Sequence, residues 1–314
     1  MLKELLDTNH CFKLVCGAGN EDVEEIKRLV YIYAIAGCRF FDLSANEEII
    51  TAAREALDLA KVYDAYLCIS VGIKSDPHVH KAVIDSDKCV NCGSCEEICP
   101  QGAIHYGKVK KEKCIGCGRC WKVCSRAAIS YISEEKNLDE VLPPIVEKGI
   151  DCIEFHAMGP DEEEIFSKWK YLNDNYEGIL SICTSRGQLS DEALVDRVKR
   201  MTEHREPYTT IIQTDGFPMS GGDDNYKSTL QAVATAEIIQ NAKLPVYIML
   251  SGGTNSKTNE LAKMCEISNC GVAVGSYARK IVKRYIERSD FWTNPNVLND
   301  ALSMAKPLVD SVIA

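Results

Sequence analysis

The sequence contains no uninterrupted apolar stretch approaching the ~20 residues that a helix needs to cross a bilayer. It also has no excess of positive charge, because 36 lysine and arginine residues stand against 46 aspartate and glutamate residues, for a formal net charge of −10. An acidic chain of this kind is unsuited to the phosphate backbone of nucleic acids and to anionic membrane surfaces. We therefore expect neither a nucleic acid nor a membrane among its partners.

Two further signals are missing from the N-terminal part of the chain. Residues 1–14 have neither the apolar core nor the small-residue cleavage site of a secretory signal peptide. The stretch Val15–Gly19 lacks the third glycine of a dinucleotide-binding fingerprint, so it does not indicate a dinucleotide site. Because the features of a signal peptide are missing, we expect a protein of the reducing cytoplasm, in which a disulfide framework does not explain the sixteen cysteines.

Eight of the sixteen cysteines fall between Cys89 and Cys124, in two groups with the same internal spacing. Each group reads C-x-x-C-x-x-C-x-x-x-C, and a proline follows only the first. Three thiolates on a two-residue spacing can face one centre, as an iron–sulfur cubane requires. Two zinc sites are the alternative, but tetrahedral zinc takes four ligands from two separated pairs. The spacing therefore favours two [4Fe-4S] clusters.

The segment from about Ala82 to Ile132 resembles the bacterial two-cluster ferredoxins. In those proteins the fourth cysteine of each run ligates the other cluster. The resemblance therefore implies a crossed assignment of ligands. The first cluster would be held by Cys89, Cys92, Cys95 and Cys124, and the second by Cys99, Cys114, Cys117 and Cys120.

Outside this segment, short apolar or β-branched runs alternate with stretches of helical spacing. Eight strand–helix units predict a (β/α)8 barrel of the TIM type, once about 50 inserted residues are subtracted from the length. An open doubly wound sheet is the alternative. The expected strands are Phe12–Cys16, Phe40–Leu43, Ala65–Val71, Cys152–Phe155, Ile179–Cys183, Thr209–Gln213, Val246–Leu250 and Val272–Val274.

The cysteine-rich segment interrupts this barrel after its third strand. We expect a first part of the barrel at 1–81, a ferredoxin-like insert at 82–132, and a second part with a closing helix at 133–314. Because the insert lies in a βα loop, the two clusters should lie over the barrel mouth, where the active sites of such barrels are found. A purely structural role for the clusters is the alternative.

Polar residues stand where the barrel strands end, at positions that a buried parallel strand would otherwise fill with apolar side chains. Because these ends meet at one rim, they predict a catalytic or substrate-binding pocket, although any one of them could simply satisfy a neighbouring polar group. Glu154 and His156 lie on the same side of their strand, as an acid/base pair, metal ligands or a buried hydrogen-bonded pair would. The candidates are Asp42, Lys74, Glu154, His156, Arg186, Gln213 and Asp215.

The loops after the seventh and eighth strands are rich in glycine. In barrels these two loops commonly form a phosphate site from glycine amides and a helix N-terminus. Their glycine placement is similar to the flavin-phosphate corner of the dihydroorotate and dihydropyrimidine dehydrogenase barrels, which implies FMN or another phosphate-bearing ligand. Glycines that serve only tight turns are the alternative. The candidate residues are Ser251, Gly252, Gly253, Gly275 and Ser276.

Three segments together resemble the light-dependent period protein family of cyanobacteria: the double-cluster insert, Gln213–Gly221 and Leu250–Asn255. The likeness extends over most of the chain. Members of that family are iron–sulfur proteins that modulate the circadian clock in response to cellular redox state. The resemblance therefore implies the barrel, the clusters and a redox-sensing regulatory role.

Three functions are compatible with these observations. The first is an iron–sulfur oxidoreductase that passes electrons between the clusters and a small ligand or flavin at the barrel mouth. The second is a non-catalytic redox sensor, and the third is an electron carrier. We favour the first because a carrier needs only the insert, whereas this chain keeps a whole barrel. The expected partner is a redox protein or a small-molecule substrate, and the sequence leaves open whether the protein is an enzyme.

Overall fold

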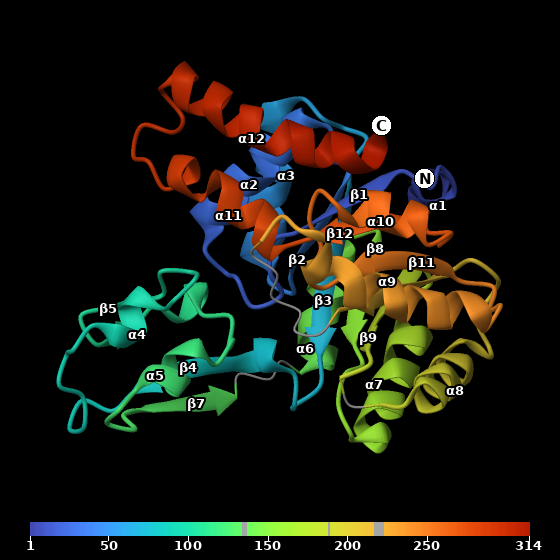
Figure 1. The fold of residues 1–314 in the computed structure, drawn as a ribbon, viewed down its shortest axis with the longest axis horizontal. Helices are drawn as coiled ribbons and strands as arrows, with labels where there is room; N and C mark the ends of the chain where they lie inside the picture. Colours follow the sequence, from blue (N-terminus) through green and yellow to red (C-terminus); the bar gives the residue numbers. More distant parts are fainter. Residues whose placement is uncertain (134–136, 188, 217–222) are drawn as a thin grey trace.

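The computed structural model describes residues 1–314 except 134–136, 188 and 217–222. Eight parallel strands close into a barrel in the order β1-β12-β11-β10-β9-β8-β3-β2 (Figure 1). The predicted (β/α)8 barrel is confirmed, and the open sheet is excluded because β1 pairs with both β12 and β2. The barrel strands are β1 Cys11–Val15, β2 Phe40–Ser44, β3 Tyr66–Gly72, β8 Cys152–His156, β9 Ile179–Ser185, β10 Thr210–Asp215, β11 Tyr247–Ser251 and β12 Gly271–Val274.

Helices alternate with these strands and cover the outside of the barrel (Figure 1). Several begin at a side chain that accepts a hydrogen bond from a backbone N–H of the first turn, as Asp22, Ser190 and Asn225 do. The barrel helices are α2 Val23–Ala36, α3 Glu47–Ala60, α6 Leu138–Glu147, α7 Glu162–Asn175, α8 Asp191–Thr202, α9 Tyr226–Asn241, α10 Thr258–Met264 and α11 Ser276–Ile286, with α1 Leu2–Asp7 and α12 Pro295–Ile313 at the two ends of the chain.

The two sides of each barrel strand serve different purposes. In β8, Phe155 faces outward and its ring lies 6.1 Å from that of Trp169 in α7. Cys152, on the inward side of β8, belongs to a separate apolar cluster inside the barrel. Leu6 of α1 belongs to the same cluster and closes it at the amino ends of the strands. The carboxyl ends of the strands carry the polar side chains, so the hydrophobic interior supports a polar mouth at one end.

The insert follows β3 and stands to one side of the barrel, at the lower left of Figure 1. Its two outer strands, β4 His80–Ile84 and β7 Ile129–Ser133, pair antiparallel, and a small hairpin joins β5 Ile104–His105 to β6 Lys108–Val109. Two short helices, α4 Ser94–Glu97 and α5 Arg119–Val123, pack on this frame. The sheet and the helices enclose a small separate core that contains Ala82, Ala103, Ile104 and Ile129.

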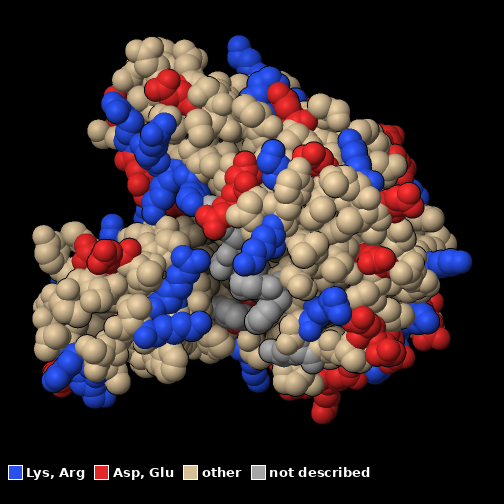
Figure 2. Space-filling view, in the orientation of Figure 1, with Lys and Arg blue, Asp and Glu red and all other residues tan. Residues whose placement is uncertain are grey.

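Polar contacts fix the insert against the mouth of the barrel. Lys81 of β4 is buried, and its ammonium donates to the carbonyl oxygens of Gly19 (2.7 Å) and Cys114 (2.8 Å). The backbone N–H of Glu21 donates to the carbonyl of Glu112 (2.7 Å), and Lys283 of α11 donates to the carbonyl of Pro100 (2.8 Å). Figure 2 shows basic side chains on both sides of the junction between insert and barrel.

Candidate functional site

Each predicted set of four cysteines lines its own cavity in the insert. Cys89, Cys92, Cys95 and Cys124 line a cavity of about 160 Å³. Cys99, Cys114, Cys117 and Cys120 line a second, smaller cavity of about 20 Å³. The fold therefore brings together the crossed sets, in which Cys99 and Cys124 each join the other group.

The environment of these sulfurs fits the cofactor that their spacing implies. Cys99 and Cys124 each accept a hydrogen bond at Sγ (3.3 Å), from the N–H of Ala103 and Ala128 respectively, so the two sets are related by an internal pseudosymmetry. Cys114 likewise accepts one from Ala82 (3.4 Å). Four convergent thiolates with N–H···S hydrogen bonds are typical of [4Fe-4S] ligation. The donor chemistry of both cavities therefore suits such a cluster.

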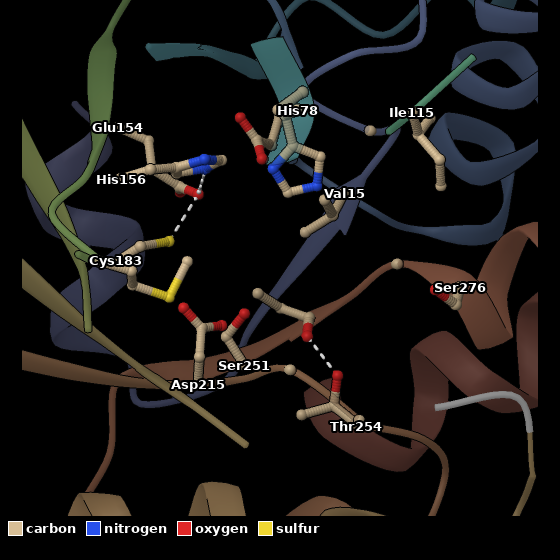
Figure 3. Close-up of a pocket in the computed structure, with 18 of the residues that line it drawn as sticks. Val15, His78, Ile115, Glu154, His156, Cys183, Asp215, Ser251, Thr254 and Ser276 are labelled. Atoms are coloured by element: carbon tan, nitrogen blue, oxygen red, sulfur yellow. Dashed lines mark hydrogen bonds and ion pairs between the residues drawn. The ribbon is translucent and has the colours of Figure 1, made fainter. Parts of the chain in front are cut away.

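A third cavity, of about 250 Å³, lies at the mouth of the barrel (Figure 3). Its walls come from the carboxyl ends of the strands and from the loops after β11 and β12. The insert also contributes two residues, Ile115 and Cys117. One member of the second cysteine set therefore borders the same space as the polar residues of the barrel mouth.

A buried lysine organises the floor below this cavity. The ammonium of Lys13, in the middle of β1, is in a salt bridge with Glu154 and lies 3.4 Å from Gln213 Oε1 and 3.9 Å from Asp42 Oδ2. Its side chain is completely buried. Since an unpaired charge in such a place is very costly, the ammonium and the carboxylates depend on each other.

A second chain of contacts runs from the loop after β3 into the mouth. Asp76 Oδ2 lies 2.6 Å from His156 Nδ1, and Asp76 Oδ1 lies 2.9 Å from His78 Nδ1. On its other side, His156 Nε2 lies 3.3 Å from Glu154 Oε1. The same Glu154 oxygen accepts a hydrogen bond from the thiol of Cys183 (3.0 Å). The contacts form a continuous network of ionisable groups from Asp76 to Cys183.

Burial changes the acidity of these groups. Desolvation, followed by the neighbouring Glu154, raises the pKa of Asp42 to about 6. Desolvation likewise raises the pKa of Asp215 to about 6. Burial alone would also raise the pKa of Asp76, but His156 and His78 hold it well below its ordinary value. Carboxyl groups with a pKa near 6 can exchange protons close to neutral pH.

The structure gathers most of the predicted mouth residues and leaves two apart. Asp42, Glu154, His156 and Asp215 line the cavity, and Gln213 lies below it, against Lys13 and Cys183. Lys74 is exposed on the loop after β3, and Arg186 is paired with Asp191 (3.0 Å) at the start of α8. Neither of these two lines the cavity, because each stands on a loop beyond the end of its strand.

The predicted glycine corner forms another wall of the cavity. Ser251, Gly252, Gly253, Gly275 and Ser276 all line it. Gly252 has a φ of +64°, and a Cβ there would lie 2.7 Å from the N atom of Gly216, so the turn requires glycine. α11 begins beside the cavity without a side-chain cap on its first N–H groups. Part of the polar loop after β10, residues 217–222, lies outside the described residues.

Sequence reasoning missed Lys13, Asp76 and Cys183. Lys13 had a signal: a charged residue in the middle of an apolar strand, at an inward position shared with Cys11. Asp76 had none, because its contact with His156 depends on the path of a loop and joins residues 80 apart in sequence. Cys183 looks like an ordinary buried core cysteine until Glu154 is placed beside it.

Two family models match the chain. One, described as the light dependent period A C-terminal domain, matches residues 144–311, and the other, a 4Fe-4S binding domain, matches 82–105 and 108–130. Light dependent period A of Synechococcus elongatus is 29% identical over 331 residues, which cover 98% of this chain and 92% of that protein. The family resemblance predicted from the sequence is confirmed.

Solved structures support the fold alone. Tryptophan synthase from M. tuberculosis is 10% identical and covers 99% of this chain and 98% of its own, with a TM-score of 0.51. The YdjI aldolase from Escherichia coli K12 is 7% identical and covers 98% of this chain and 92% of its own, with a TM-score of 0.52. Among the described residues, no helix is long and apolar enough to span a membrane.

Proposed function

We propose a redox function for this chain, which belongs to the light dependent period A C-terminal domain family and carries a 4Fe-4S binding domain. The function is that of an iron–sulfur oxidoreductase that passes electrons to or from a small ligand in the barrel mouth. The observation that carries the proposal is the position of Cys117, which borders the mouth cavity together with Glu154, His156 and Asp215.

Two [4Fe-4S] clusters are part of this proposal, and they would supply one-electron transfer when bound. Cys99, Cys114, Cys117 and Cys120 would hold one of them beside the mouth. The other set, with Cys124, lies where the insert exposes Val90 and Tyr106 to solvent. This exposed surface suits a redox partner protein. Sixteen free cysteines favour a reducing compartment, and we propose the cytoplasm.

The residues of the mouth would bind the ligand and manage its protons. Asp215 lines the cavity, and with a pKa of about 6 its carboxyl group can give or take a proton near neutral pH. The glycine corner and the open N-terminus of α11 would accept a phosphate group. We therefore propose FMN, or another phosphate-bearing molecule, as the ligand.

Anaerobic reduction of added FMN by the dithionite-reduced protein tests this proposal. We expect Asp215→Asn to slow FMN reduction by about 100-fold, because it removes a proton donor, while the iron content stays unchanged. Arg186→Gln is the matched control, since Arg186 lies outside the cavity. Equal rates in the wild type and Asp215→Asn would mean that electrons leave directly from the insert, and would contradict the proposal.

A redox sensor without turnover is the second candidate. The exposed aromatic side chains of Tyr106 and Trp121 beside the cysteine sets favour it, because aromatic residues are enriched where proteins bind each other. Under this alternative, Trp121→Ser would abolish redox-dependent binding of a partner, and Asp215→Asn would leave that binding intact.

A further inference from the structure

Three different donor atoms meet at the base of the mouth cavity. The Sγ of Cys183 lies 3.0 Å from Oε1 of Glu154, which lies 3.3 Å from Nε2 of His156. All three residues line the cavity, and the three donor atoms lie within 4.8 Å of one another (Figure 3). Metal–ligand bonds of about 2.0–2.3 Å in a tetrahedral zinc site place neighbouring ligand atoms about 3.3–3.7 Å apart. The two measured separations, 3.0 and 3.3 Å, are close to that spacing.

Two of the donor atoms are also oriented by a residue that contacts the other polar atom of the same side chain. Asp76 holds His156 through Nδ1 (2.6 Å), which directs Nε2 towards the cavity. Lys13 holds Glu154 through Oε2 and leaves Oε1 to face the other donors. Outer carboxylates that orient a histidine are a regular feature of protein metal sites.

The third donor has its own support, because the side-chain amide of Gln213 donates to Cys183 Sγ (3.2 Å). Burial, Asp215 and Glu154 raise the pKa of the Cys183 thiol well above its ordinary value, so a metal would have to displace its proton, and the amide would then stabilise the thiolate that binds the metal. Each of the three donors is therefore paired with a different outer residue, and together these six side chains come from four barrel strands and the loop after β3.

Two further buried carboxylates line the same cavity. Asp42 and Asp215 are only 1% and 4% exposed and line the cavity. Among the described residues, Oδ2 of Asp215 has no hydrogen-bond partner, and Oδ2 of Asp42 has only the ammonium of Lys13, 3.9 Å away. Buried carboxylate oxygens without partners are unfavourable unless a cation or a proton compensates them.

We propose that His156, Glu154 and Cys183 bind a single divalent cation of the zinc class, separate from the eight cysteines of the insert. The mixed nitrogen, oxygen and sulfur donors suit zinc or ferrous iron and disfavour magnesium and calcium, which prefer oxygen ligands. Three protein ligands leave a coordination position that opens into the cavity, as in catalytic rather than structural sites. Metal binding at this site does not require electron transfer, because the three ligand atoms already lie close together in the structure.

Zinc binding to the anaerobic, cluster-loaded protein tests this inference. The protein is equilibrated with an equimolar amount of Zn²⁺, desalted, and analysed for zinc and iron together. We expect one zinc per chain with no loss of iron in the wild type. We expect His156→Gln and Cys183→Ser each to lower retained zinc at least tenfold, as loss of one of three protein ligands should. His204→Gln, at an exposed position, and Cys270→Ser, at a buried position away from the mouth, are matched controls that should retain the metal.

A cobalt experiment identifies the sulfur ligand without relying on affinity. Co²⁺ bound in place of zinc should give visible d–d bands whose position shifts when Cys183 becomes serine and stays fixed in Cys270→Ser. The inference is overturned if the wild type retains no zinc, if bound zinc displaces an equivalent amount of iron, or if Cys183→Ser leaves the cobalt spectrum unchanged. None of these results bears on FMN reduction, so the site and the proposed redox function fail separately.

Discussion

The ammonium of Lys81, in the first strand of the insert, donates a hydrogen bond to the carbonyl oxygen of Gly19, in the loop after the first barrel strand (2.7 Å). Lys81 also donates to the carbonyl of Cys114 (2.8 Å), the residue that begins the second cysteine group. A single buried side chain therefore joins the barrel mouth, the insert frame and the cysteine set that faces the mouth.

Replacing Lys81 with methionine should loosen this junction. Two buried carbonyl oxygens would lose a donor, which we expect to reduce the free energy of unfolding by about 2–3 kcal/mol. Hydrogen–deuterium exchange should accelerate in residues 17–21 and 113–117 and stay unchanged in α7. Lys88→Met, at an exposed position of the insert, is the control. Unchanged exchange at both loops would show that Lys81 does not hold the junction.

The crossed cysteine sets predict which of the two clusters each cysteine substitution removes. Anaerobic protein should contain about eight irons per chain, the sum of two cubanes. Cys124→Ala should lose about half of them and expose Cys89, Cys92 and Cys95 to alkylation by iodoacetamide. Cys99→Ala should instead expose the other group, as its cavity partners indicate. The readout is iron analysis combined with mass spectrometry of the labelled cysteines.

Cys265→Ala is the control for this experiment, because Cys265 is exposed and belongs to neither set. If each substitution instead exposed the cysteines of its own sequential group, the crossed assignment would be wrong.

At the other end of the barrel, Tyr247 predicts a dependence of stability on alkaline pH. Its hydroxyl donates to Asp7 of α1, and burial first, then this carboxylate, raises the pKa of Tyr247 above its ordinary value. An unfolded tyrosine ionises near pH 10. The contribution is therefore complete below about pH 10 and is lost as the pH rises from there towards the raised folded value.

The variant Tyr247→Phe should cost about 1 kcal/mol of unfolding free energy at pH 8, the worth of one hydrogen bond. Above pH 10 the difference from the wild type should shrink, because the wild type alone loses the contribution of this phenol. Urea titrations at several pH values measure both quantities. Tyr63→Phe, at an exposed tyrosine, should follow the wild type throughout, and a constant difference at all pH values would contradict the assignment.

Much of this architecture is predictable from the sequence because it depends on the local spacing of apolar residues and cysteines. All eight predicted strands lie within two residues of the observed barrel strands, since a run such as Ile179–Cys183 must be buried on both sides. The cysteine spacing likewise predicts that three sulfurs of each group converge, and the resemblance to two-cluster ferredoxins implies the crossed fourth ligand.

The mouth network is less predictable, because its contacts depend on loops and on charges brought together from distant strands. Asp76 and Pro77 signal a turn, but nothing in the sequence shows that this turn brings Asp76 to His156, 80 residues away. Arg186 stands just beyond the end of β9 and pairs outside the cavity with Asp191, only five residues away. Strand positions could be predicted to point inward, whereas loop positions could not.

The pair of Lys13 and Glu154 gives the sharpest test of how the mouth is built. Lys13→Met should be strongly destabilising, by about 3–5 kcal/mol, because it leaves the buried carboxylate of Asp42 without its cation and leaves Glu154 with His156 alone. The double variant Lys13→Met/Glu154→Gln removes both partners of the salt bridge, so it should recover a large part of that loss. Urea unfolding of the wild type, both single variants and the double variant completes the cycle. Strictly additive losses would mean that the ammonium and the carboxylate do not stabilise one another, and that the floor of the cavity is held by packing alone.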